Sequence, residues 1–250
     1  MIPELDLGPI DIQTFGLMLA LALIADGLIV AKRLGELGKP VDWAYEAVFA
    51  AGVGGVVGAK IDWMLQNPEQ AFDGSLADAI LGPGLVFFGG LLGGAIAVCL
   101  WAYRRDFLGL QLLDLGAPAV ALGYAIGRIG CQVAGDGDYG VPSDLPWAMA
   151  YPDGTVPTTV EVHPTPIYET LAMGVATIVL WRLRGRLVRG VLFGLYLVIA
   201  GVERFLIEFI RRNETVVAGL TLAQLISVAM VVAGSAFVAW RMRAARVATA

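Results

Sequence analysis

Seven apolar runs, each about as long as a lipid bilayer is thick, constrain what this 250-residue chain can fold into. A helix needs roughly 20 apolar residues to cross a hydrocarbon core about 30 Å thick. The runs cover residues 12–31, 44–65, 84–103, 112–134, 167–181, 190–210 and 217–240, and the fifth is the shortest and could extend at either end. The sequence therefore predicts an all-α polytopic membrane protein with seven transmembrane helices.

The composition agrees with this class. Hydrophobic residues make up 58% of the chain and charged residues 16%, whereas soluble domains have about 45–50% and about 25%. The 32 glycines predict close helix packing, because small residues let membrane helices approach each other. Residues 1–250 are expected to form a single integral membrane domain.

The charge and the metal-ligating residues exclude several functions. A net charge of −5 provides no basic footprint for nucleic acid. One histidine and two cysteines cannot form a structural zinc site, so we expect no metal and no other cofactor. Both cysteines lie in apolar runs, which excludes a disulfide framework.

The basic residues predict the orientation, because short loops rich in lysine and arginine stay in the cytoplasm. Twelve of the 17 lie in alternate loops or in the C-terminal tail, which predicts an N-out, C-in topology: Lys32, Arg33, Lys39, Arg104, Arg105, Arg182, Arg184, Arg186, Arg189, Arg241, Arg243 and Arg246. Segments 66–83 and 135–166 contain no lysine or arginine and are predicted to lie outside. The proline-rich segment 135–166 is expected to be an ordered extracytoplasmic loop that caps the bundle. No cationic region precedes the first run, so we expect no cleaved signal peptide.

Five basic residues do not follow this pattern. Subtracting 12 from 17 leaves Lys60, Arg128, Arg204, Arg211 and Arg212, inside the predicted spans or near their outer ends. A charge at the centre of a span costs about 2.5–3.5 kcal/mol on insertion scales, so such residues normally face the bundle interior and have partners. We therefore expect an anionic partner or ligand there.

Arg204, Glu208 and Arg211 have i, i+4, i+7 spacing and share one helix face. One interpretation is a self-neutralising ladder. The other is a ligand site, because two arginines on that face meet one glutamate and leave a positive charge uncompensated.

Tyr124, Arg128 and Cys131 share a second face with the same spacing, beside a small-residue face of Gly123 and Gly127. No acid on that helix neutralises Arg128, so its partner belongs to another helix or to a ligand. A phosphate would suit both arginine faces, because guanidinium groups bind phosphate through two hydrogen bonds and keep their charge.

The segment HPTPIYE, residues 163–169, leads from the loop into the fifth run. It could be a loop anchor, with Tyr168 in the interfacial aromatic belt. His163 is also the one histidine of the chain, the residue type whose ordinary pKa lies near neutrality. The glycine pairs of the third run, Gly89 with Gly93 and Gly90 with Gly94, are interpreted as helix-packing contacts.

Three stretches together resemble the prolipoprotein diacylglyceryl transferase family of bacterial inner-membrane enzymes. They are GRIGCQVAGDGDYG (127–140), HPTPIYE (163–169) and ERFLIEFIRR (203–212), in the order found in that family. The resemblance implies a seven-span protein of the bacterial inner membrane with its active site on the extracytoplasmic side. It also implies transfer of the diacylglyceryl group of phosphatidylglycerol to the lipobox cysteine of a prolipoprotein, with release of glycerol 1-phosphate.

The partners implied are phosphatidylglycerol, lipobox peptides and the lipid bilayer. On this basis the expected catalytic residues are His163, Arg128, Arg204, Asp136 and Glu208, and the expected substrate-binding residues are Arg128, Arg204, Arg211, Tyr124, Tyr168, Glu169 and Gly140. His163 is predicted to be the general base, held by Asp136 or Asp138.

Four positions depart from the family pattern, and each replacement removes or weakens a hydrogen-bonding group: Phe88 for a histidine, Cys131 for an asparagine, Phe15 for a tyrosine and Ala200 for a tyrosine. The acceptor thiol must lose its proton before it attacks carbon. His163, Asp136, Asp138 and Glu208 are therefore the candidate bases, and a non-catalytic lipid- or lipoprotein-binding relative is an alternative.

Two further classes fit less well. The sequence GDGD at residues 135–138 matches one element of intramembrane aspartyl proteases, with Asp26, Asp62 and Asp114 as candidates for the second aspartate. Carboxylates in such a glycine-rich loop often only form turns. A small-solute transporter would need polar residues along a path at the midplane, whereas here they cluster toward one face.

Overall fold

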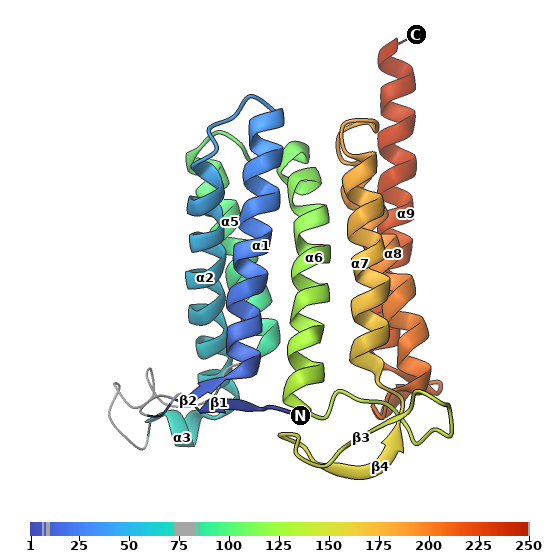
Figure 1. Cartoon of the computed structure of the whole chain (residues 1–250). Helices are drawn as coiled ribbons and strands as arrows, with labels where there is room; N and C mark the ends of the chain where they lie inside the picture. The colour runs from blue at the N-terminus through green and yellow to red at the C-terminus, as the bar shows by residue number, and fades with distance from the viewer. Residues whose placement is uncertain (7, 9–10, 73–83, 85, 250) are drawn as a thin grey trace. The chain divides into compact units, whose positions relative to one another are not determined.

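A computed structural model describes residues 1–6, 8, 11–72, 84 and 86–249 (Figure 1). Its helices are α1 (Thr14–Glu36), α2 (Trp43–Gln66), α3 (Pro68–Phe72), α5 (Phe87–Arg104), α6 (Leu110–Ala134), α7 (Thr165–Leu183), α8 (Val191–Ile207) with the 3-10 turn η1 (Glu208–Ile210), and α9 (Leu222–Thr249). Short antiparallel ribbons accompany them: β1 (Glu4–Asp6) with β2 (Asp11–Gln13), β3 (Met149–Tyr151) with β4 (Thr158–Val162), and β5 (Thr215–Val217) with β6 (Leu220–Thr221).

Each of the seven predicted runs coincides for most of its length with one long helix. α7 extends beyond both ends of its run, to Thr165 and Leu183. Four of the described helices are long and apolar enough to cross a membrane, namely α1, α2, α6 and α9, and α5 is a shorter apolar helix. The chain is an all-α membrane protein.

The start of the seventh run was predicted wrongly. Residues 215–221 form the hairpin β5–β6, in which Val217 pairs with Leu220. The two residues between them, Ala218 and Gly219, have φ values of +49° and +75°. Tight hairpin turns need positive φ at both central positions, so the chain turns here and α9 begins at Leu222 instead of residue 217.

The chain forms two compact units, described separately below. Unit 1 contains Met1–Ile29 and Leu113–Ala250, and unit 2 contains Val30–Leu112.

Unit 2 is built on a glycine-mediated contact between α2 and α5. A Cβ atom added to Gly58 would lie 2.8 Å from the Cα of Gly93, and one added to Gly54 would lie 2.6 Å from the Gly93 carbonyl oxygen. Any side chain at these positions would separate the helices. The interpretation of the third-run glycines as packing residues is therefore confirmed.

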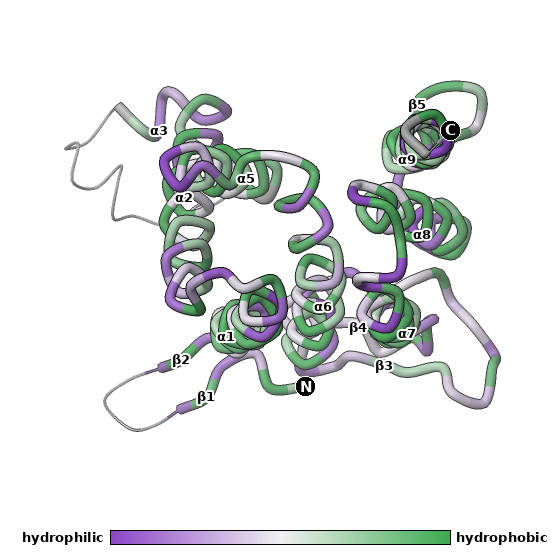
Figure 2. The backbone as a smooth tube through the Cα atoms, turned by 90° about the horizontal axis from the view of Figure 1, so that it is seen from above, coloured by the Kyte–Doolittle hydropathy of each residue, from purple (hydrophilic) through white to green (hydrophobic). Residues whose placement is uncertain are grey.

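In unit 1, α8 and α9 pack against each other in the same way and appear side by side in Figure 2. A Cβ atom on Gly201 would lie 2.8 Å from the Ser227 carbonyl oxygen, and one on Gly234 would lie 2.7 Å from that of Gly194. The core beside them joins α6, α7 and α8 and is rich in alanine: Ala117, Ala121, Ala125, Met173, Ala176, Leu180 and Leu192.

The predicted small-residue packing face of α6 is only half right. A Cβ atom on Gly123 would lie 2.5 Å from Oδ2 of Asp26 on α1, whereas one on Gly127 would have no neighbour within 4 Å among the described residues. Gly123 makes room for an acid, and Gly127 faces open space.

Segment 135–166 has regular structure of its own. Tyr139 stacks on Tyr151 with ring centroids 4.8 Å apart, and both pack with Val162 in a small buried cluster. The Tyr139 hydroxyl donates to the Val156 carbonyl oxygen at 3.0 Å. That this segment caps the bundle stays a prediction.

Candidate functional site

Backbone hydrogen bonds join the three stretches that carry the resemblance. The Gly140 amide donates to the His163 carbonyl oxygen at 2.8 Å, and the His163 amide donates to the Val141 carbonyl oxygen at 3.1 Å. The Val141 amide then donates to the Ile210 carbonyl oxygen at 2.8 Å. These bonds bring the end of α6, the start of α7 and the end of α8 together in unit 1.

Gly140 lies at the centre of this junction. A Cβ atom there would lie 2.9 Å from the Cβ of His163 and closer still to the Ile210 carbonyl oxygen. The predicted substrate-binding residue Gly140 therefore has a steric role, since any larger residue would keep the three backbone segments apart.

Arg128 and Arg211 share the carboxylate of Asp138. Each guanidinium forms an ion pair with one of its two oxygens, Arg128 with Oδ2 and Arg211 with Oδ1. Two bonds to the Asp138 carbonyl oxygen hold its backbone, one from Arg211 Nη1 at 3.1 Å and one from Thr165 Oγ1 at 2.5 Å. Two guanidinium groups from separate segments are thus placed to hold one anion between them.

Glu169 on α7 is the central buried acid. Its side chain has no exposed surface, and its carboxylate oxygens lie 3.2 Å from Arg128 Nε, 3.2 Å from Arg204 Nη1 and 3.6 Å from Arg211 Nη1. The Tyr124 hydroxyl donates to Oε1 at 2.7 Å. A buried carboxylate is expensive unless it is paired, and this one has three cationic partners.

Glu208, also without exposed side-chain surface, pairs with the two arginines on its own helix face. Its Oε2 lies 2.9 Å from Arg204 Nη2 and 4.0 Å from Arg211 Nε. Asn213 Nδ2 donates to Oε1 at 2.7 Å. The interpretation of this helix face as a self-neutralising ladder is therefore confirmed for Glu208 and its two arginines.

Together these side chains form the arginine–carboxylate cluster, which we define as Arg128, Arg204, Arg211, Asp138, Glu169 and Glu208. Its three positive and three negative groups balance. The expectation of an uncompensated positive charge on the α8 face is therefore wrong, because Glu169 and Asp138 reach that face from other segments. The expectation that Arg128 has its partner on another element is confirmed.

Asp138 differs from the other two acids because it remains accessible, with 32% of its side chain exposed. Burial alone would raise the pKa of its carboxyl, but the charges of Arg128 and then Arg211 outweigh burial and lower that pKa below its ordinary value. Asp138 is thus an ionised and partly exposed carboxylate between two guanidinium groups.

His163 lies at the edge of the site and is half-buried. Its Nδ1 is 3.4 Å from the Tyr168 hydroxyl, and Trp147 Nε1 donates to that same hydroxyl at 2.7 Å. Within the described residues the polar partner of the ring is this tyrosine, so the expectation that Asp136 or Asp138 holds the ring is wrong. The reason is that Asp138 is already shared by two arginines.

Two of the other candidate bases already accept hydrogen bonds or form ion pairs within the protein. Asp136 Oδ1 accepts from the Asp138 amide at 3.2 Å, the kind of turn that aspartate often makes in a glycine-rich loop. Glu208 is buried and paired, as described above. Asp136 is half-buried, and Glu208 has no exposed side-chain surface.

The four positions that depart from the family pattern have different surroundings in the structure. Cys131 is buried, with its Sγ 3.7 Å from Arg128 Nη1. Ala200 packs against the alanine-rich core, and Phe15, 44% exposed, contacts the helix face at Gly130. Phe88 lies in the first turn of α5 in unit 2, with 63% of its surface exposed.

One group of possible metal ligands occurs in the site. The donor atoms of Cys131, Asp136 and Asp138 lie within 4.8 Å of one another. A cation does not fit there, because both Asp138 oxygens already accept from guanidinium groups and Arg128 also faces the Cys131 sulfur. We assign no metal to these residues.

Two of the three aspartates considered as the second protease aspartate have other roles. Asp114 accepts from the amides of Gly190 and Phe193 at 2.6 and 3.0 Å, at the start of α8, where an acid complements the helix dipole. Asp62 accepts from the Gly89 amide at 2.9 Å, at the start of α5. These contacts favour helix capping over catalysis.

The sequence interpretation missed several site contacts. The sequence predicts Asp138 as a candidate base or as a carboxylate that holds His163, but not as the partner of Arg128, although its position ten residues after Arg128 was a usable signal. Trp147, Thr165 and Asn213 support Tyr168, Asp138 and Glu208 respectively. No pattern in the sequence pointed to these three, because their partners are distant or lie across a turn.

Comparisons with known proteins match this chain to one family. Residues 4–240 match the family model described as prolipoprotein diacylglyceryl transferase. Proteins named phosphatidylglycerol–prolipoprotein diacylglyceryl transferase are similar in Clostridium tetani (32% identity, 90% of this chain and 91% of that protein) and in Chromohalobacter salexigens (33% identity, 96% and 94%). A third, in Azotobacter vinelandii, is 31% identical over 96% of each chain.

The match extends over nearly the whole chain and includes the stretches that form the arginine–carboxylate cluster. This chain therefore belongs to the prolipoprotein diacylglyceryl transferase family.

Proposed function

We propose that this protein transfers the diacylglyceryl group of phosphatidylglycerol to the lipobox cysteine of prolipoproteins, the first step of lipoprotein maturation. Membership of the family supports the reaction class. The observation that carries the proposal is the pair of guanidinium groups, Arg128 and Arg211, that hold one anion between them. An arginine pair of this kind suits a phosphodiester.

The phosphate of the lipid takes the place of the Asp138 carboxylate. Among the three acids of the cluster Asp138 is the exposed one, whereas Glu169 and Glu208 have no exposed side-chain surface. A headgroup can therefore displace Asp138 without opening the buried part of the cluster. Glu169 keeps the arginines in position in the absence of lipid, and Tyr124 orients Glu169.

The reaction breaks one bond and forms another. His163 accepts the proton of the lipobox thiol. The thiolate then attacks the carbon of the diacylglyceryl unit that is bonded to the phosphate oxygen. A carbon–sulfur bond forms, the carbon–oxygen bond breaks, and glycerol 1-phosphate leaves with the electron pair. Arg128, Arg204 and Arg211 stabilise the negative charge of this leaving group, and Tyr168 positions the imidazole.

The protein is proposed to lie in the bacterial inner membrane with seven spans, N-out and C-in, and with the active site on the extracytoplasmic side. The distribution of lysine and arginine supports this topology. The segment 135–166 then covers the site from outside. A reporter that is active only outside the cytoplasm should be active when fused after Asp153 and silent after Arg186; the reverse pattern contradicts the topology.

Complementation tests the function directly. The gene is expressed in a strain depleted of its own prolipoprotein diacylglyceryl transferase, and lipoprotein maturation is followed by gel mobility. Purified protein with phosphatidylglycerol and a lipobox peptide provides the matching assay in vitro. Transfer in both supports the proposal, whereas lipid binding without transfer would favour the non-catalytic relative that the replacement at Phe88 suggests.

A further inference from the structure

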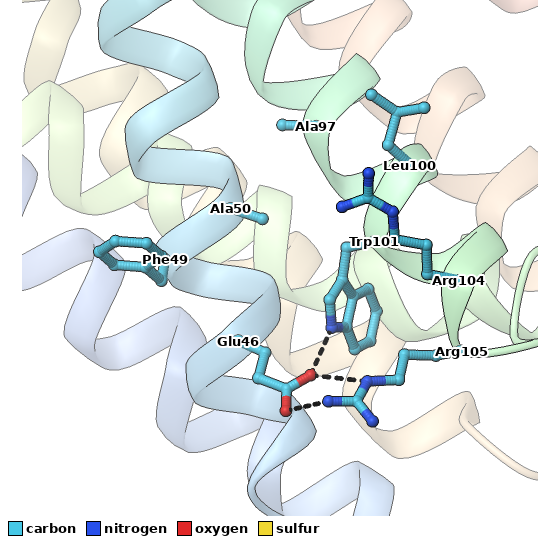
Figure 3. A pocket seen from close by; sticks show the side chains of 8 residues that line it. All are labelled: Glu46, Phe49, Ala50, Ala97, Leu100, Trp101, Arg104 and Arg105. Carbon is cyan, nitrogen blue, oxygen red and sulfur yellow. Dashed lines mark hydrogen bonds and ion pairs between the residues drawn. The ribbon is translucent and has the colours of Figure 1, made fainter.

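A second candidate site lies entirely within unit 2, in a groove between α2 and α5 (Figure 3). Its walls are apolar and consist of Phe49 and Ala50 from α2 and Ala97 and Leu100 from α5. Phe49 is 73% exposed and Leu100 55% exposed. The walls of the groove therefore include exposed apolar side chains.

The polar end of the groove is already partly organised. The two oxygens of Glu46 accept from Arg105, Oε1 from Nη2 at 2.5 Å and Oε2 from Nε at 2.9 Å. Trp101 Nε1 also donates to Oε2, at 2.8 Å. The charges of Glu46 and Arg105 thereby balance each other, and both oxygens of Glu46 accept hydrogen bonds.

Arg104 also lies at this polar end, but unlike Arg105 it is not paired with an acid among the described residues. It is exposed and lines the groove, and Figure 3 shows its guanidinium between the side chains of Leu100 and Trp101, away from the Glu46–Arg105 pair. Among the described residues no hydrogen bond, ion pair or ring contact to Arg104 is found. The groove therefore carries one uncompensated positive charge.

The charged and the apolar residues of the groove lie at different heights along the two helices. Glu46 belongs to the first turn of α2 and Arg104 to the last turn of α5, so both lie where the helices leave the membrane. Ala97 precedes Arg104 by seven residues, which is about 10 Å along a helix. The groove thus runs from the headgroup region into the acyl region, with an indole at the boundary, where tryptophan is favoured.

We propose that this groove binds an anionic glycerophospholipid. Its phosphate pairs with Arg104, and one acyl chain lies along Phe49, Ala50, Ala97 and Leu100. A zwitterionic lipid is disfavoured because the charge of Glu46, the acid that could attract its cationic group, is already balanced by Arg105. Basic pockets between membrane helices are suited to anionic headgroups. This inference does not depend on the proposed catalytic function, because no residue is shared with the arginine–carboxylate cluster.

Photo-crosslinking tests the proposal. Full-length protein with p-benzoylphenylalanine in place of Phe49 is reconstituted in vesicles of equal parts dioleoyl phosphatidylglycerol and dioleoyl phosphatidylcholine, without acceptor peptide. After illumination the lipid adducts are identified by mass. We expect about fivefold enrichment of phosphatidylglycerol adducts, since one arginine near the surface contributes about 1 kcal/mol to the attraction of anionic lipid.

Matched positions provide the controls. The same label at Val56, an exposed residue of α2 that does not line the groove, should yield adducts in the proportions of the vesicle. Arg104→Gln should abolish the enrichment at position 49, whereas Arg243→Gln, at an exposed arginine of α9, should leave it intact. Ala50→Leu, which fills the groove, should reduce the adducts at position 49.

Two results would overturn the proposal. One is an adduct composition at position 49 equal to that of the vesicle. The other is an enrichment that persists in Arg104→Gln, which would attribute it to the general attraction of the basic surface. Loss of the lipid adducts at position 49 on addition of 10 mM glycerol phosphate, about a ten-thousandfold excess over a micromolar dissociation constant, would indicate a site for free phosphate and would contradict the proposal as well.

Discussion

The arginine–carboxylate cluster of unit 1 and the α2–α5 pair of unit 2 are held together by opposite means. The cluster brings three arginines and three acids into a space where Glu169 and Glu208 have no exposed surface. The α2–α5 pair brings glycine against glycine, with Gly58 and Gly93 in direct backbone contact. Both regions occur in a chain that is overwhelmingly apolar.

The difference shows what each kind of residue does in a membrane protein. Lipid does not drive apolar helices together, so their association depends on close van der Waals packing, which small residues permit. Six charges add nothing to such packing and carry a desolvation cost. Their presence in one cluster therefore indicates binding or chemistry, whereas the glycines indicate structure.

The largest expected effect concerns His163 in the catalytic region. His163→Ala should reduce transfer by about 100-fold to 10,000-fold, the usual contribution of a general base, in purified protein with phosphatidylglycerol and a lipobox peptide. Lipid binding should persist, because the arginines are untouched. If the variant transfers lipid at the parental rate, His163 is not the general base, and a carboxylate or the arginines alone must support the reaction.

The next largest effect concerns the guanidinium geometry. Arg128→Lys and Arg204→Lys should each lower transfer by about 10-fold to 100-fold, nearly as much as alanine, because losing charge-assisted hydrogen bonds costs about 1.5–3 kcal/mol and an ammonium cannot reproduce the planar fork. Initial rates at several lipid concentrations measure this loss. Full activity of both lysine variants would reduce the cluster to a structural role and remove the contrast with the glycine-packed region.

A smaller effect is expected in the α2–α5 pair. Gly58→Ala should lower the stability of the protein in detergent by about 1–3 kcal/mol, the usual cost of overpacking, measured as the unfolding midpoint. Gly174→Ala on α7 is the matched control, because a Cβ atom there meets nothing within 4 Å in the described part of the chain. If both variants melt alike, the glycines of α2 and α5 do not hold that pair together.

The smallest effect concerns the pH dependence of the Asp138 ion pairs. Folding lowers the pKa of Asp138, so its pairs stabilise the folded state above the ordinary aspartate pKa of about 3.9 and lose that contribution as the pH falls through the folded-state value. The difference in unfolding midpoint between the parental protein and Asp138→Asn should thus be constant above about pH 5 and shrink at lower pH. A difference that grows on acidification would contradict the assignment.

Much of the fold could be predicted because apolar length is a local property. The seven runs lead to seven long helices, and the glycines of the third run pack as expected. The start of α9 could not be predicted from hydropathy, because Val216 and Val217 are apolar yet pair in a hairpin. The turn chemistry of Ala218 and Gly219 decided that boundary.

The sequence by itself determined that this is an apolar, helical membrane protein, which residues carry unusual charges, and which family it belongs to. Those properties depend on composition and on short motifs. Only the tertiary structure decided how the charges are partnered: Glu169 reaches the arginines from another helix, Asp138 bridges two of them, and His163 pairs with Tyr168. The physical reason is that electrostatic balance depends on distances in space, and residues 128, 138, 169 and 211 become neighbours only when the ends of α6, α7 and α8 meet.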